Sequence, residues 1–276
     1  MQQNNKKPTT YGTFENPNDR AKFAKHVIAV TSGKGGVGKS TVSANLSVAL
    51  AQAGFKVGIL DADIYGPDIP RLLNIRNDTL KWGSDDKIIP SENYGLKIMS
   101  VGITTPTPDT PLVWRSSVAV SALVQLIEDV AWGELDFLVI DMPPGTGDIQ
   151  LTVAQEMKIS AGILVTTPQA VATDDVSRAI RMFQDIKVPI AGIIENMSYF
   201  VTPDTKARYD IFGSGGGEML AANYGVNLLG QIPLLMQVRE LSDEGMPPVA
   251  HADEEYKKYY RDIAESLVDY LKVKQG

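Results

Sequence analysis

The chain has 276 residues, of which 43% are hydrophobic, and a formal net charge of −7. This length predicts one large domain with a sizeable core, and the acidic balance argues against nucleic acid or an anionic membrane as the main partner. No cysteine is present, which excludes disulfides, thiol redox chemistry and soft-metal ligation by this chain.

The first residues are polar, and alternating apolar segments follow them. Residues 1–25 predict a flexible tail, and order is expected to begin at His26. Short runs rich in Val, Ile and Leu then alternate with segments of helical spacing, which predicts a single α/β domain over residues 26–276. Its sheet is expected to be twisted and mostly parallel, with helices on both faces. The predicted strands are 26–31, 56–63, 96–101, 135–142, 161–168, 189–196 and 226–233; the predicted helices are 39–53, 117–130, 147–157, 171–185 and 215–224.

The remaining segments are loops and a C-terminal helix. Turn residues predict surface connections at 76–94 and 104–111. Near the C-terminus, apolar residues recur at helical spacing, and the opposite face mixes acidic and basic side chains. This pattern favours a helix docked on its own core over one that lies on a membrane. The apolar face consists of Tyr256, Tyr259, Ile263, Leu267 and Leu271. We find no signal-peptide pattern and no apolar run near ~18 residues, so we expect a cytoplasmic protein without a membrane partner.

A glycine-rich motif, GKGGVGKS, lies between the first predicted strand and the first predicted helix. It fits the phosphate-loop pattern G-x-x-x-x-G-K-[ST], in which main-chain N–H groups and a helix N-terminus surround a phosphate. We expect Lys39 to reach the β- and γ-phosphates of ATP, Ser40 to place its hydroxyl on Mg²⁺, and Thr41 to lie near the α-phosphate. The alternative is a glycine-rich turn that binds nothing.

Lys34 is a second lysine in this loop. Its position just after Gly33 resembles the deviant Walker A ATPases, the class that includes MinD, ParA and the nitrogenase iron protein. The resemblance implies that Lys34 reaches the nucleotide of the partner subunit in a homodimer. There its charge would stabilise the transferring phosphoryl group, as an arginine finger does. A surface lysine of no consequence is the alternative.

Carboxylates follow two of the predicted strands. Asp63 is placed like the first switch of this class, where a carboxylate orients the attacking water, so Lys34, Lys39 and Asp63 are the predicted catalytic residues. Asp61 is expected near the magnesium shell. Both aspartates have a helix or loop cap as the alternative role.

The third predicted carboxylate, Asp141, ends an apolar strand in the Walker B arrangement, so Ser40 and Asp141 are the predicted Mg²⁺ ligands. The PPGTGD segment that follows is the expected second switch. Asn196 ends another strand and is expected to pair with the edges of adenine, with a satisfied turn asparagine as the alternative. The predicted nucleotide-binding residues are Gly33, Lys34, Gly35, Gly36, Val37, Gly38, Lys39, Ser40, Thr41 and Asn196.

Several motifs together resemble the Mrp/ApbC family of ATPases, known as iron-sulfur cluster carriers. They are GKGGVGKST, DADIYGPDIP, TPLVWR, IDMPPGTGD, ENMSYF and YDIFGSGGGE. The resemblance covers about residues 26–245. It implies a cytoplasmic homodimer that binds and hydrolyses ATP and passes an iron-sulfur cluster to apoproteins.

The sequence departs from that family where a cluster would be held. Many members follow ENMSYF with a C-P-x-C pair, whereas this chain has Thr202 and Thr205 in the cysteine positions. Threonine hydroxyls cannot replace thiolates on iron, so no iron-sulfur ligand is predicted. Ser116 and Ser117 also stand where the family commonly has Gly-Pro.

Three accounts of function stay open. The protein acts as an ATP-driven partner or scaffold in cluster assembly, or it borrows thiolates from a partner protein or a small thiol. In the third account it is a MinD/ParA-like dimer switch that positions or recruits another component. A nucleotide kinase is a further alternative, but it leaves Lys34 without a purpose, and no arginine-rich lid is evident.

Overall fold

The computed structural model describes residues 23–104 and 116–275. Its centre is an eight-stranded sheet built from β1 (Ala24–Ser32), β2 (Val57–Asp61), β5 (Ser91–Asn93), β6 (Leu96–Ser100), β7 (Leu135–Asp141), β8 (Ala161–Thr166), β9 (Ile190–Glu195) and β12 (Leu228–Gln231). The strand order is β12-β9-β8-β1-β7-β2-β6-β5. Every pairing in it is parallel except that of the edge strand β5 with β6. The predicted fold class is therefore confirmed.

All seven parallel strands coincide with predicted strands. β2 and β8 are buried at every residue, because helices cover both faces of the sheet and leave no solvent-facing positions for polar side chains. β1 begins at Ala24 instead of the predicted His26, since Ala24 pairs with Leu135 of β7. Residues 1–22 of the predicted tail lie outside the described residues.

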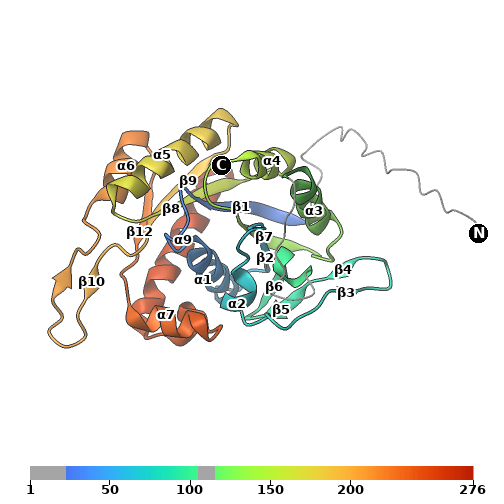
Figure 1. Ribbon diagram of the computed structural model, residues 1–276, viewed down its shortest axis with the longest axis horizontal. Coiled ribbons are helices and arrows are strands. Elements are labelled where there is room, and N and C mark those ends of the chain that lie inside the picture. Colours follow the sequence, from blue (N-terminus) through green and yellow to red (C-terminus); the bar gives the residue numbers. More distant parts are fainter. Residues whose placement is uncertain (1–22, 105–115, 276) are drawn as a thin grey trace, which may run out of the picture.

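The helices form two groups on opposite sides of the sheet (Figure 1). They are α1 (Lys39–Gln52), α2 (Ile69–Leu72), α3 (Ser116–Glu128), α4 (Asp148–Glu156), α5 (Ala170–Asp185), α6 (Gly216–Tyr224), α7 (Met236–Asp243), α8 (Pro248–His251) and α9 (Glu254–Gln275). On one side α3 packs on α4 and α5 packs on α6; on the other, α1 contacts α2, α8 and α9. The helix α1, which follows the phosphate loop, therefore lies between the central sheet and a second layer of helices.

The C-terminal helix α9 docks on α1, α8 and β12, as predicted. One detail of the prediction is wrong: Tyr260, not Tyr259, lies on the buried face, and Tyr259 is half-buried with its hydroxyl 3.0 Å from that of Tyr199. None of the helices formed by residues 23–104 and 116–275 is long and apolar enough to cross a membrane. The buried face consists of Tyr256, Tyr260, Ile263, Leu267 and Leu271.

The predicted surface connection at 76–94 contains short strands that were not predicted. The segment holds β5 and a hairpin of β3 (Lys81–Trp82) and β4 (Ile88–Ile89). Ile88 is buried, and its backbone N–H donates to the Asp129 carbonyl while its carbonyl accepts from Ala131. These long-range backbone bonds stabilise strands too short to show a sequence period. Residues 105–115, with most of the predicted connection 104–111 and the TPLVWR motif, lie outside the described residues.

A second hairpin, β10 (Phe200–Val201) and β11 (Arg208–Tyr209), was also not predicted. Figure 1 shows the β10–β11 and β3–β4 hairpins projecting at opposite ends of the molecule. The Arg208 guanidinium lies 4.1 Å from the centre of the Tyr199 ring, a cation–π contact that fixes the base of the β10–β11 hairpin.

Candidate nucleotide-binding site

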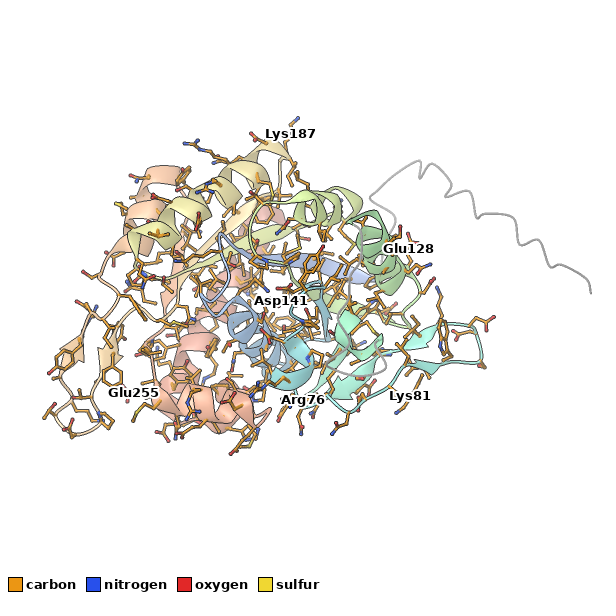
Figure 2. The ribbon with its side chains drawn as sticks, viewed as in Figure 1. Arg76, Lys81, Glu128, Asp141, Lys187 and Glu255 are labelled. Carbon is orange, nitrogen blue, oxygen red and sulfur yellow. The ribbon has the colours of Figure 1, made fainter. Side chains whose placement is uncertain are left out.

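The carboxyl ends of β1, β2 and β7 meet at one edge of the sheet, where α/β proteins bind ligands. In the strand register, Asp141 is the partner of both Val30 on β1 and Asp61 on β2. Asp61 and Asp141 are both fully buried. In Figure 2, Asp141 lies near the centre of the view, whereas Lys187 lies toward its upper edge.

Two glycines of the phosphate loop are required by packing. Gly38 has a φ of 81°, a left-handed conformation, and a Cβ there would collide with the side-chain amide of Asn196. A Cβ at Gly33 would collide with the backbone of α5 at Asp175. The loop is therefore seated between α5 and the segment after β9, and its shape is set by protein neighbours.

The other two glycines leave the loop open. A Cβ at Gly35 or Gly36 would meet no protein atom within 4 Å. Gly36 also has a left-handed φ of 82°, and α1 begins directly after the loop at Lys39. An uncrowded backbone at the N-terminus of a helix is the arrangement that accepts a phosphate group, so this chain's residues fit a bound nucleotide.

Four predicted residues come together beneath the loop. The Lys39 ammonium lies 2.7 Å from Asp141 Oδ2 and 4.0 Å from Asp63 Oδ2. The Ser40 hydroxyl donates to the same Asp141 oxygen at 2.7 Å. A hydroxyl beside a carboxylate is the hard-oxygen donor set that Mg²⁺ prefers, so Ser40 and Asp141 fit the metal assigned to them.

Asp61 acts as a cap for the loop that follows β2. Its carboxyl oxygens accept hydrogen bonds from the backbone N–H groups of Asp63 and Ile69 and from the Ser100 hydroxyl. Burial, reinforced by the Asp141 charge, raises the pKa of Asp61 well above its usual value, against the opposing influence of Lys39. The geometry matches the predicted alternative, a loop cap.

Asp63 lies closer to solvent than Asp61, with 13% of its side chain exposed. Burial raises the pKa of Asp63, the nearby Lys39 charge opposes this shift, and Asp141 adds to it. The Asp63 carboxyl is therefore partly accessible to water, as its predicted role requires.

Asn196 contacts the phosphate loop from the side. Its amide nitrogen donates to the Val37 carbonyl at 2.8 Å, and the residue is buried. Beside it lies a cavity of about 320 Å³, lined by Gly38, Thr41 and Asn196 together with Leu234, Leu235 and other residues of the α7 side. One amide N–H remains for a ligand, and the pairing of Asn196 with adenine stays a prediction.

Sequence reasoning missed two polar side chains in the site. Gln150 donates from its amide to the carbonyls of Pro143 and Pro144, at 3.0 and 2.7 Å, and so holds the predicted second switch. Ser43 donates to Asp141 Oδ1 at 2.6 Å. No sequence signal points to Gln150, whereas Ser43 lies one helical turn beyond Lys39 and Ser40 and shares their face of α1.

Lys34 is half-buried, and the loop holds its backbone through a hydrogen bond from the Ser32 hydroxyl to the Lys34 carbonyl at 2.9 Å. Among the carboxylates whose side chains the structure describes, which leaves out Asp148 and Glu156, none lies within ion-pair distance of its ammonium group. A contact with a second subunit stays a prediction.

The two threonines that stand in the predicted cysteine positions lie in the loop of the β10–β11 hairpin. Their hydroxyl oxygens are 2.6 Å apart, and Thr202 Oγ1 also accepts from the backbone N–H of Ala207. Asp204 accepts from the backbone N–H of Thr205 at 2.7 Å, which lowers the pKa of its carboxyl. The loop is exposed, and its hydroxyl donors do not fit an iron-sulfur cluster.

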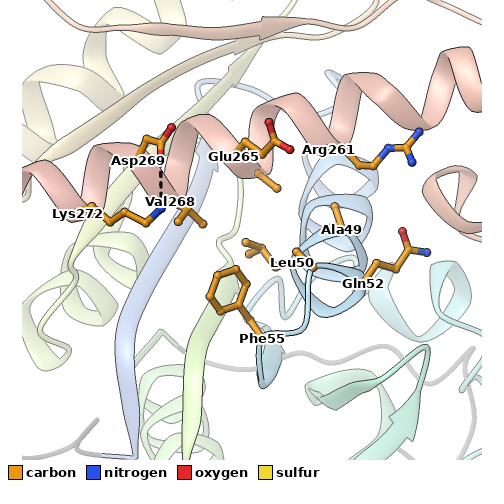
Figure 3. A pocket seen from close by; sticks show the side chains of 11 residues that line it. Ala49, Leu50, Gln52, Phe55, Arg261, Glu265, Val268, Asp269 and Lys272 are labelled. Atoms are coloured by element: carbon orange, nitrogen blue, oxygen red, sulfur yellow. Dashed lines mark hydrogen bonds and ion pairs between the residues drawn. The ribbon is translucent and has the colours of Figure 1, made fainter.

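A separate cavity of about 530 Å³ lies between the C-terminal half of α1 and α9 (Figure 3). Leu50, Phe55 and Val268 contribute apolar surface, while Arg261 and the Lys272–Asp269 ion pair contribute charge. No residue of the phosphate loop lines it. It is therefore distinct from the nucleotide site.

A model of the ParA family, described as the NUBPL iron-transfer P-loop NTPases, matches residues 23–268. The chain belongs to this family. As a NUBPL/ParA-family NTPase, it is 49% identical over 251 residues to an iron-sulfur cluster carrier protein of Aquifex aeolicus, covering 91% of this chain and 69% of the relative. It is also 49% identical over 250 residues to an iron-sulfur protein required for NADH dehydrogenase, mitochondrial, of Arabidopsis thaliana, covering 90% of this chain and 79% of the relative.

Solved structures agree with this NTPase assignment. A nucleotide-binding protein of Archaeoglobus fulgidus in complex with ADP superimposes with a TM-score of 0.76 and 37% identity, covering 87% of this chain and 94% of that one. The cell division ATPase MinD of Pyrococcus furiosus superimposes with a TM-score of 0.66 at 22% identity, covering 89% of this chain and 99% of that one. The MinD likeness shows the shared fold.

Proposed function

We propose that this chain is a Mg²⁺-dependent, homodimeric ATPase that works in the cytoplasm in iron-sulfur cluster assembly or transfer to apoproteins. The observation that carries the proposal is the buried cluster of Lys39, Ser40 and Asp141 beneath an open phosphate loop, in a chain of the iron-transfer NTPase family. The carrier protein of Aquifex aeolicus supports the iron-sulfur role.

Each residue has a distinct task in this ATPase. The loop glycines leave backbone N–H groups open to the phosphates. The Lys39 ammonium, which pairs with Asp141 in the structure, would pair with a phosphate group when the nucleotide binds. Ser40 and Asp141 would hold Mg²⁺, which offsets the charge of the β- and γ-phosphates when bound. Asp63 orients the attacking water, and Asn196 contacts the adenine from the neighbouring cavity.

Lys34 is the residue that links the proposed ATPase activity to dimerisation. No carboxylate whose side chain the structure describes pairs with the ammonium group of Lys34, and a hydrogen bond from the Ser32 hydroxyl holds its backbone carbonyl within the loop. An ammonium group that is delivered to a second subunit's nucleotide would make hydrolysis depend on association. This dependence would allow ATP to control when the carrier or scaffold meets its client.

The missing cysteines set the form of the iron-sulfur role. Without a thiolate, this chain does not ligate a cluster alone, so it acts either as an ATP-driven partner in assembly or with thiolates borrowed from a partner or a small thiol. The hydroxyls of Thr202 and Thr205 hydrogen-bond to each other and not to a ligand, which favours a second candidate function. This candidate is a MinD/ParA-like switch that recruits another component without binding a cluster.

Two measurements test the proposal. Purified protein should hydrolyse ATP with Mg²⁺ and lose that activity when the metal is chelated; no hydrolysis in either condition would refute the ATPase. Cells that lack the protein should lose activity of iron-sulfur enzymes. Normal enzyme activities, together with ATP-dependent recruitment of the protein to a partner, would favour the switch.

A further inference from the structure

Asp141 is held at both of its carboxylate oxygens. Oδ2 accepts from the Lys39 ammonium and the Ser40 hydroxyl, each at 2.7 Å. Oδ1 accepts from the Ser43 hydroxyl at 2.6 Å. Ser43 and Asp141 are both fully buried, so the bond between them is shielded from water.

The backbone of α1 fixes the position of the Ser43 hydroxyl. Ser43 Oγ lies 3.1 Å from the carbonyl of Lys39, four residues earlier, which is the alternative acceptor for its single hydroxyl proton. The bond to Asp141 is shorter, as expected of a hydroxyl that donates to a charged acceptor. A rigid helix therefore places one donor against one oxygen of a carboxylate at the end of a buried strand.

We propose that Ser43 is a positioning residue for the Mg²⁺ site. By holding Oδ1, Ser43 would prevent the Asp141 carboxylate from rotating and would keep Oδ2 beside the Ser40 hydroxyl, the other expected Mg²⁺ ligand. This inference rests on the proposed ATPase function. Residues that orient metal ligands typically affect metal affinity by about 10–100-fold.

The test compares Ser43→Ala with Ser47→Ala. Ser47 is also fully buried on α1, and its hydroxyl donates to the Ser43 carbonyl at 2.7 Å without a hydrogen bond to Asp141. Both variants delete one buried hydroxyl from the same helix. Binding of fluorescent ADP is measured first in a chelator and then during a Mg²⁺ titration, which separates nucleotide affinity from metal affinity without relying on turnover.

We expect Ser43→Ala to bind ADP in chelator within about twofold of the parent and to need about tenfold more Mg²⁺ for half-maximal tightening. Ser47→Ala should follow the parent in both measurements. Ser43→Cys keeps the approximate shape and a weak donor, so its Mg²⁺ requirement should lie between those of the parent and Ser43→Ala. The Cys variant carries the test if Ser43→Ala fails to fold.

Two results would overturn the inference alone: an unchanged Mg²⁺ requirement in a folded Ser43 variant, or an equal rise in Ser47→Ala, which would indicate helix packing. Parent protein that binds no nucleotide at all overturns the proposed function and this inference together. If the parent protein binds ADP more tightly when Mg²⁺ is added, the proposed function stands, and an unchanged Ser43 variant then counts against the Ser43 inference alone.

Discussion

The Lys39→Met substitution isolates the buried ion pair at the centre of the site. Lys39 is 6% exposed and Asp141 is fully buried, with 2.7 Å between the charged atoms. Removing one partner of a buried pair costs about 3–5 kcal/mol, because the other charge is left uncompensated. Asp141 keeps the hydroxyl donors of Ser40 and Ser43, so we expect the lower value, about 3 kcal/mol. For a domain of this size, that loss lowers the melting temperature by about 6–12 °C.

The assay is thermal unfolding in buffer free of nucleotide and metal, so that only the protein's own contacts contribute. Lys272→Met is the control, because Lys272 pairs with Asp269 at 3.3 Å on the surface and should change stability by less than about 1 kcal/mol. The double variant Lys39→Met/Asp141→Asn removes both charges and should recover most of the loss. A parental melting temperature for Lys39→Met, or a double variant as unstable as the sum of the single changes, would refute the reasoning.

Three further outcomes are expected. Lys34→Ala should bind ATP as the parent does and lower turnover on the order of 10³-fold in steady-state assays; parental turnover would contradict the role in trans. Gly38→Ala should lower the free energy of unfolding, measured in urea, by about 2 kcal/mol, because the residue has a left-handed φ and the new Cβ would collide with the buried amide of Asn196. The control Gly54→Ala should lower it by about 1 kcal/mol, because Gly54 has a φ of 94° but no atom within 4 Å of a Cβ. Equal losses would mean that packing at the loop is unimportant. Thr202→Cys/Thr205→Cys should gain visible absorption and bound iron after anaerobic reconstitution with iron and sulfide, because the two positions are neighbours in one loop and the pairs of two subunits would supply the four thiolates of a cluster. Iron in the unsubstituted protein would contradict the view that the chain holds no cluster alone.

The sheet was predictable because of the environment of its strands. A strand that helices cover on both faces must be apolar throughout, as β2 and β8 are, and such runs stand out in a sequence. The β3–β4 hairpin was not predictable in this way. Each of its strands has two residues, too few for a period, and backbone bonds to a distant loop stabilise it.

A site residue was predictable when its position at the end of a strand was enough to place it at the nucleotide-binding edge of the sheet. Asp141 ends an apolar strand, and the carboxyl ends of parallel strands share one edge. The register that pairs Asp61 with Asp141 is a property of the assembled sheet, so the shift in the Asp61 pKa had no sequence signal. The same holds for Asn196, whose contact with Val37 joins loops 159 residues apart.

The loop between β10 and β11 keeps its shape without any cargo. Bonds among its own threonine hydroxyls, the Asp204 carboxylate and the backbone close it, and none of these groups is changed by air or by the supply of iron. A client protein would therefore meet the same surface in an iron-starved cell and in a replete one. Any response of this loop to iron status therefore has to come from the molecules that it meets.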